Sequence, residues 1–104
     1  MKEKDKKEDL LFLEDLDFDK ESIEEIYNRF TEETIKLLND NCETVKVNIS
    51  YLKNLGISNY QEAFIRFYNM FLMEPTTFDD IFSKYDKDDL VVKLEKNIAI
   101  LEHL

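Results

Sequence analysis

The sequence predicts an all-α protein, a small bundle of four to five helices joined by short loops. The 104 residues include one Gly and one Pro, too few for the turns that a many-stranded sandwich or barrel needs every ~8–12 residues. Apolar residues make up 43% of the chain and recur with helical spacing over most of it. This length fits one domain. We therefore expect a disordered charged arm over residues 1–9 and a single helical domain over residues 10–104.

The first helix is predicted at about residues 20–39, where apolar side chains follow a 3.6-residue period and Asn39-Asp40-Asn41 ends the pattern. Asp19 is the expected N-cap. Before it, an apolar patch over residues 10–18 is expected to pack on the core, as one turn of helix or as an extended lead-in.

Residues 45–55 fit two structures. Val45 to Tyr51 alternates apolar and polar residues as a strand does, whereas Val45, Ile49, Leu52 and Leu55 form a helical stripe. A single strand would lack a partner. Gly56 also stands where a left-handed residue closes a helix, with Ile57 placed to pack back on Leu52. The pattern favours a helix.

Three further helices complete the prediction. Ser58 and Gln61 match a capping box before an almost wholly apolar helix from Tyr60 to Met73, which Pro75 ends. Thr77 is the expected cap of a short helix that continues to Tyr85. The Asp86–Asp89 cluster, with three acidic residues, suits the N-terminus of a last helix that runs to Leu104.

The sequence also contains a weak internal repeat. Residues 45–55 align with residues 94–104 at an offset of 49, with one Asn, one Ile and two Leu identical. Repeated helix pairs are typical of stacked helical scaffolds.

Residues 48–58, Asn-Ile-Ser-Tyr-Leu-Lys-Asn-Leu-Gly-Ile-Ser, resemble the Leu-rich helix and Leu-Gly corner of mitochondrial transcription termination factor-type helical repeats. The resemblance covers eleven residues. It implies an all-α curved scaffold with a nucleic-acid-binding tendency, and we take from it the helical architecture and no functional residue.

The charge restricts the partners. With 24 acidic and 14 basic residues, the formal net charge is −10. Nucleic-acid binding depends on cations that displace counterions from phosphates, so a direct nucleic-acid binder is disfavoured and a protein with a basic surface is the expected partner. Acidic residues concentrate over residues 14–33, with nine acids and two bases, and over residues 74–89, with six acids and two bases. The simplest alternative is that this charge only keeps a small protein soluble.

Carboxylates one helical turn apart lie ~5–6 Å from one another, close to phosphate spacing, so they could imitate a nucleic acid. We therefore expect a non-enzymatic inhibitor of a nucleic-acid-binding protein, of the phage or mobile-element type such as an anti-CRISPR, in the cytoplasm. The partner-binding residues that this hypothesis selects are Glu14, Asp15, Asp17, Glu21, Glu24, Glu25, Glu32, Glu33, Asp79, Asp80, Asp86, Asp88 and Asp89.

The alternative hypothesis is a helical-repeat scaffold or adaptor that binds partners, or a second copy of itself, through aromatic and Leu-rich faces. The helix expected over residues 60–73 would present Phe67, Phe71, Met70 or Met73.

The sequence offers no catalytic or cofactor site. Asp15-Leu16-Asp17-Phe18-Asp19 imitates the start of an EF-hand loop, but Lys20 and Ile26 stand where that loop needs Gly and Glu. A zinc site needs three or four nitrogen or sulfur ligands, and Cys42 and His103 are the single cysteine and the single histidine. We expect no enzyme, no metal and no cofactor.

Overall fold

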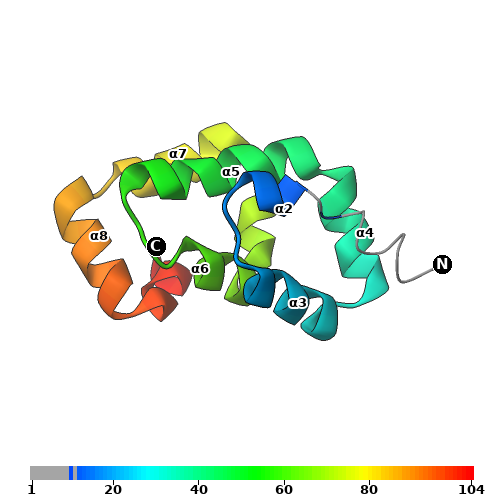
Figure 1. The fold of residues 1–104 in the computed structure, drawn as a ribbon. Coiled ribbons are helices and arrows are strands. Elements are labelled where there is room, and N and C mark those ends of the chain that lie inside the picture. The colour runs from blue at the N-terminus through cyan, green and yellow to red at the C-terminus, as the bar shows by residue number, and fades with distance from the viewer. Residues whose placement is uncertain (1–9, 11) are drawn as a thin grey trace.

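The computed structural model describes residues 10 and 12–104, which form seven α-helices and two 3₁₀ helices with no strand among them (Figure 1). The all-α class is confirmed for this part of the chain, with more and shorter helices than four or five. The predicted arm over residues 1–9 lies outside the described residues. The helices are α2 (Phe12–Asp15), α3 (Lys20–Arg29), α4 (Glu32–Asp40), α5 (Cys42–Leu55), α6 (Tyr60–Arg66), η1 (Tyr68–Leu72), α7 (Pro75–Ser83), α8 (Lys87–Lys96) and η2 (Ile98–His103).

The single helix expected over residues 20–39 is wrong, because the chain breaks between α3 and α4. Phe30 adopts an extended backbone (φ −90°, ψ 143°), and Thr31 then caps α4 through its Oγ1, which accepts from the Thr34 N–H at 3.1 Å. Thr31 is followed by two acidic residues in the first turn of α4, and this combination is a start signal inside the periodic stretch.

Two other helices end earlier than expected. The helix predicted from Tyr60 to Met73 stops at Arg66, and η1 follows a break at Phe67 (φ −130°). The last helix stops at Lys96. At Asn97 the chain turns, and the Asn97 Oδ1 accepts from the Ala99 N–H at the start of η2 (3.2 Å).

Several capping predictions are also corrected. Ser58 and Gln61 do not form a capping box, because Asn59 occupies the N-cap of α6 and both side chains bond elsewhere. Asp19 is the N-cap residue of α3 but makes no side-chain capping bond. Thr77 lies inside α7, which begins at Pro75. Asp86 does cap α8, through a bond from the Asp89 N–H (3.1 Å).

Residues 45–55 are helical, as the stripe favoured. α5 closes at Gly56 (φ 102°), where the Ile57 N–H donates to the Leu52 O at 3.3 Å and the Gly56 N–H to the Lys53 O at 3.1 Å. These two bonds form the Schellman motif that the sequence predicted.

The same motif occurs a second time, at the end of α2. Asp17 is the one non-glycine residue with positive φ (64°) in the described part. The Phe18 N–H donates to the Leu13 O and the Asp17 N–H to the Glu14 O, each at 3.2 Å. Leu13, Asp17 and Phe18 therefore correspond to Leu52, Gly56 and Ile57, and the residue numbers in each pair differ by 39.

A third helix pair follows the second, but corresponding residues of these two pairs differ in number by 30 instead of 39. Both α5–α6–η1 and α7–α8–η2 consist of two helices and a 3₁₀ helix. Three pairs of core residues differ by 30 in number, namely Leu52 and Phe82, Phe64 and Leu94, and Phe71 and Leu101. The 49-residue repeat is wrong, because it matches Asn48 in the middle of α5 with Asn97, where α8 has ended.

The described chain is thus three stacked units, α2–α3, α5–α6–η1 and α7–α8–η2, with α4 connecting the first two. α2 packs on α5 and α3 on α6, and α5 then packs on α7 and α6 on η2. An aromatic column, defined here as Phe18, Phe64, Phe71, Phe78 and Phe82, crosses all three units with ring centroids 4.8–5.7 Å apart. Two of these ring contacts, Phe18 with Phe64 and Phe71 with Phe78, join neighbouring units.

Candidate acidic interaction surface

Eight of the predicted partner-binding residues lie on the first unit and on the start of α4, and all eight are exposed. We call this set the acidic surface. It consists of Glu14, Asp15, Asp17, Glu21, Glu24, Glu25, Glu32 and Glu33.

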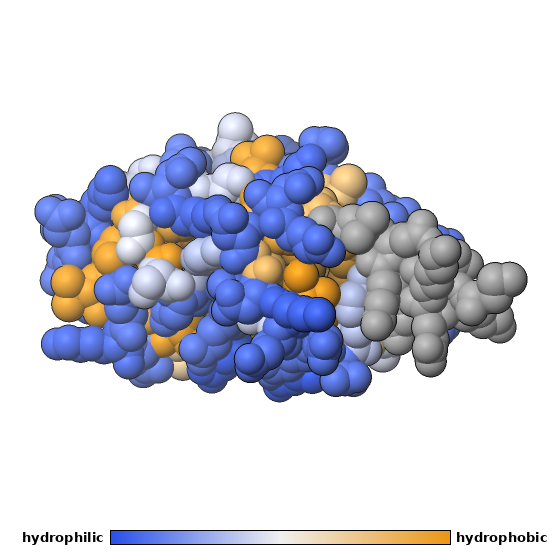
Figure 2. Space-filling model, viewed as in Figure 1, coloured by the Kyte–Doolittle hydropathy of each residue, from blue (hydrophilic) through white to orange (hydrophobic). Residues whose placement is uncertain are grey.

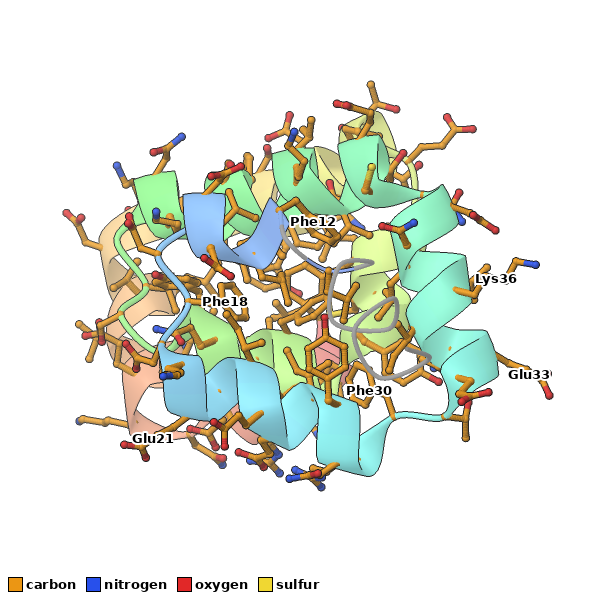
Figure 3. The ribbon with its side chains drawn as sticks, turned by 45° about the vertical axis from the view of Figure 1, so that its right-hand side comes forward. Phe12, Phe18, Glu21, Phe30, Glu33 and Lys36 are labelled. Carbon is orange, nitrogen blue, oxygen red and sulfur yellow. The ribbon has the colours of Figure 1, made fainter. Side chains whose placement is uncertain are left out.

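The amphipathic pattern of these short helices explains why the carboxylates face outward. Phe12, Phe18 and Phe30 point to the interior, whereas Glu21 at the start of α3 and Glu33 at the start of α4 point to solvent (Figure 3). Phe18 is fixed by an edge-on contact with the Phe64 ring at 5.7 Å. Since the apolar side chains of these helices pack inward, the acidic residues on the other side of each helix project into water.

Two members of the acidic surface form ion pairs. Asp17 accepts from Lys53 Nζ at 2.7 Å, and Glu25 pairs with Arg29 at 2.9 Å on the same helix. Within the described residues the other six make no ion pair. Their charges are therefore available to a partner.

The acidic residues of α7 and α8 form a separate group. The described structure does not join Asp79, Asp80, Asp86, Asp88 and Asp89 to the acidic surface, because α7 packs on α5 and α8 lies at the opposite end of the molecule from α4 (Figure 1). Bases also accompany them: residues 79–104 contain four lysines and seven acids, and Asp89 pairs with Lys93 at 3.0 Å. The field at this end is accordingly weaker than at the acidic surface.

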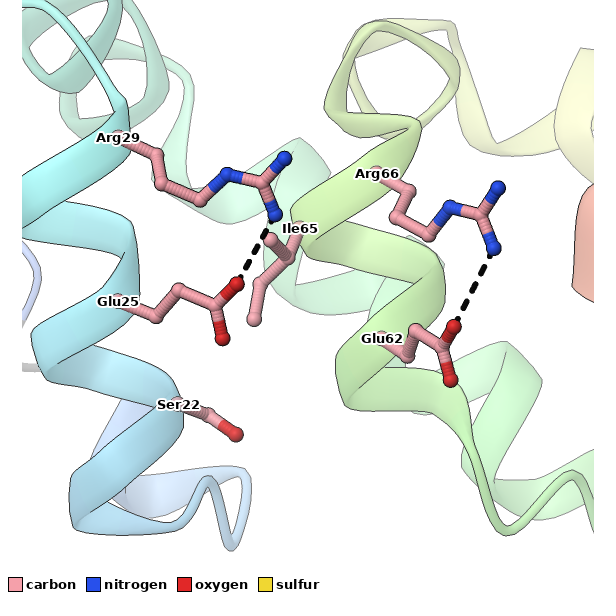
Figure 4. A pocket seen from close by; sticks show the side chains of 6 residues that line it. All are labelled: Ser22, Glu25, Arg29, Glu62, Ile65 and Arg66. Atoms are coloured by element: carbon pink, nitrogen blue, oxygen red, sulfur yellow. Dashed lines mark hydrogen bonds and ion pairs between the residues drawn. The ribbon is translucent and has the colours of Figure 1, made fainter.

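A shallow groove of about 360 Å³ lies between α3 and α6, beside the acidic surface. Two parallel ion pairs line it, Glu25 with Arg29 and Glu62 with Arg66, the latter at 3.3 Å (Figure 4). Ser22 and Ile65 complete the lining. This groove was not predicted from the sequence, although its acid–base pairs four residues apart were visible there as a helical spacing.

The aromatic residues of the alternative hypothesis are largely internal. Phe71 is fully buried and belongs to the aromatic column. Phe67, Met70 and Met73 are partly buried and pack against the core. A scaffold would therefore have to bind through other residues.

Hydrogen bonds between units shift two side-chain pKa values. The Asp17 carboxylate, bonded to Lys53 Nζ, raises the pKa of Lys53. The Ser58 hydroxyl and N–H both donate to the Glu95 carboxylate, at 2.7 and 3.0 Å, and so lower the pKa of Glu95. Asp17 lies in the turn after α2 and Ser58 in the turn after α5, and each bond joins that turn to the unit that follows. These shifts therefore belong to the stacking of the units.

The titratable residues do not form a metal cluster. Within residues 10 and 12–104, no three His, Cys, Asp or Glu side chains are placed to hold a metal ion. Cys42 is a partly buried free thiol at the start of α5, and His103 is exposed in the last turn of η2. No described helix has the length and apolarity needed to cross a membrane.

Comparison of the chain with protein-family models, with curated proteins and with solved structures gave no match. The class that the fold and surface define is an all-α acidic protein built from stacked helix pairs.

Proposed function

We propose that this chain is a non-enzymatic interaction protein whose acidic surface binds a basic protein surface. The observation that carries the proposal is the set of six exposed carboxylates on α2, α3 and α4 that make no ion pair within the described residues. Charges of one sign on one side of a molecule steer oppositely charged partners and favour specific pairing with them.

The partner class that fits best is a nucleic-acid-binding protein. Glu21 and Glu24 lie one turn apart on α3, which places their side chains ~5–6 Å from each other, close to phosphate spacing. In this proposal the chain occupies the nucleic-acid site of its partner as a mimic, and acts as an inhibitor of the phage or mobile-element type, for example an anti-CRISPR, in the cytoplasm.

The stacked units favour a second candidate function, that of a helical scaffold. Repeated helix pairs present extended surfaces to partners. Since the aromatic faces are inside, such a scaffold would also use its charged exterior, and its binding would share the salt dependence described next.

The test uses immobilised protein and lysate at about 50 and 500 mM salt. Bound proteins are then eluted with duplex DNA and identified. If the acidic surface mimics a nucleic acid, DNA-binding proteins are captured at low salt, are lost at high salt and are displaced by duplex DNA.

Two matched variants locate the surface. The triple variant Glu21→Lys, Glu24→Lys, Glu33→Lys should reduce capture at least ~10-fold. The control, Glu74→Lys, Asp80→Lys, Glu102→Lys, changes the net charge equally at exposed residues outside the acidic surface, and it should retain most of the capture. Equal loss in both variants, or tight binding of duplex DNA by the chain itself, would contradict the proposal.

A further inference from the structure

The outward side of α8 presents one apolar residue between an acidic and a basic residue. Val92 is 51% exposed, whereas Leu90 and Leu94 on the opposite side of the helix are buried. Asp88 and Lys96 are both exposed, and neither forms an ion pair within the described residues. Each lies four residues, about one helical turn, from Val92.

This arrangement is complementary to itself. When two copies of α8 pack antiparallel with Val92 at the centre, Asp88 of one copy lies opposite Lys96 of the other, and the same ion pair occurs again on the other side of Val92.

We propose that two copies of this chain associate through α8, as an antiparallel helix pair related by a two-fold axis at Val92. A two-fold interface requires one patch that is complementary to itself, and the order acid, apolar, base at four-residue spacing meets that requirement. Coiled-coil pairs likewise use charges that flank an apolar contact to set the orientation of the two helices.

The distribution of charge supports this face. For a chain with a net charge of −10, self-association is opposed wherever acidic surfaces meet. Residues 84–104, with four lysines and five acids, are nearly neutral. Figure 2 shows hydrophobic side chains at the end of the molecule where Figure 1 places α8, away from α4. The proposed pair therefore leaves the acidic surface free for a different partner.

The contact is small. α8 has ten residues and is about 15 Å long, so the pair buries less than the ~1,200–2,000 Å² of a stable interface. We expect a reversible dimer with a dissociation constant on the order of 10–100 µM.

Sedimentation velocity of the full chain, from about 5 µM to 1 mM, tests the proposal. The wild type should pass from monomer to dimer over this range. Val92→Glu should weaken association at least ~10-fold. The matched control is Val47→Glu, which adds the same charge at a residue on α5 that is 50% exposed, and it should dimerise like the wild type.

A charge exchange tests the pairing itself. Asp88→Lys alone and Lys96→Asp alone each place like charges opposite one another twice, and each should weaken the dimer about 10-fold. The double variant Asp88→Lys, Lys96→Asp restores both pairs at an unchanged net charge, and it should restore association. Both changes oppose the dipole of α8, so recovery could not come from a more stable helix. Circular dichroism of each variant confirms that it is folded.

Three results would overturn the proposal. These are a wild type that stays monomeric at 1 mM, a dimer that Val92→Glu leaves intact, and a double variant that associates no better than the single ones. The salt-dependent capture tested above does not involve α8, so either proposal can fail while the other holds.

Discussion

Asn48 is the one polar residue of the hydrophobic core in the described part, and it is 1% exposed. It lies in the middle of α5, and its Nδ2 donates to the Phe71 O and the Met73 O, both at 2.9 Å. These carbonyls lie at the end of η1, where backbone acceptors lack helical partners. The amide therefore fixes η1 against α5.

We predict that Asn48→Ala lowers the free energy of unfolding by about 2–4 kcal/mol, because the buried Phe71 carbonyl and the part-buried Met73 carbonyl lose their donor and the side chain leaves a cavity. Urea denaturation measures the change. Asn54→Ala, on the exposed side of α5, is the control and should change it by less than about 0.5 kcal/mol. Equal effects of the two substitutions would show that the buried bonds do not hold η1.

Some residue-scale features were predictable and others were not. Exposure of the acidic residues followed from the helical pattern, since each lies between apolar positions. The Asp17–Lys53 bond joins residues 36 positions apart, and the Ser58–Glu95 bonds join residues 37 apart. Nothing local in the sequence indicates such partners, because stacking of the units brings them together.

At the scale of the element, helices formed where periodicity placed them, but those predicted over residues 20–39, from Tyr60 to Met73 and up to Leu104 ended earlier. Thr31, Phe67 and Asn97 each interrupt an apolar pattern that continues past them. The pattern continues because the residues on both sides of each break face the same core. Periodicity alone cannot tell one helix from two that share a buried side.

Gly56 gives a test of an element's end. The left-handed φ of 102° strains any residue with a Cβ, while no atom beyond the two flanking residues lies within 4 Å of the position that a Cβ would take. We therefore predict that Gly56→Ala costs about 1–2 kcal/mol of unfolding free energy. Gly56→Asn should cost less, since Asn tolerates this conformation better. Thermal unfolding compares the two, and an equal cost would indicate a cause other than backbone strain.

At the scale of the whole molecule, the Ser58–Glu95 bonds tie the turn after α5 to the C-terminal half of α8. Because they lower the pKa of Glu95, the ionised form is favoured in the folded state. This contribution is present above the ordinary pKa of 4.5 and is lost as the pH falls through the lower folded-state value.

We accordingly predict that Glu95→Gln destabilises the protein above about pH 5, and that the difference from the wild type shrinks toward pH 3. Urea midpoints at several pH values measure it. Glu102→Gln, at an exposed residue of η2, should show a difference that does not change in this way. A constant gap for Glu95→Gln would mean that the Ser58 bonds do not stabilise the ionised carboxylate.

The aromatic column has a consequence for how the protein comes apart. In long repeat proteins the units interact only with their neighbours, and terminal ones can melt separately. Here Phe64 of the middle unit contacts the Phe18 ring of the first unit, and Phe71 contacts the Phe78 ring of the third. Unfolding of either terminal unit would therefore remove aromatic contacts from the middle unit. Thermal unfolding should therefore be a single cooperative transition, and limited proteolysis should detect no partly folded intermediate.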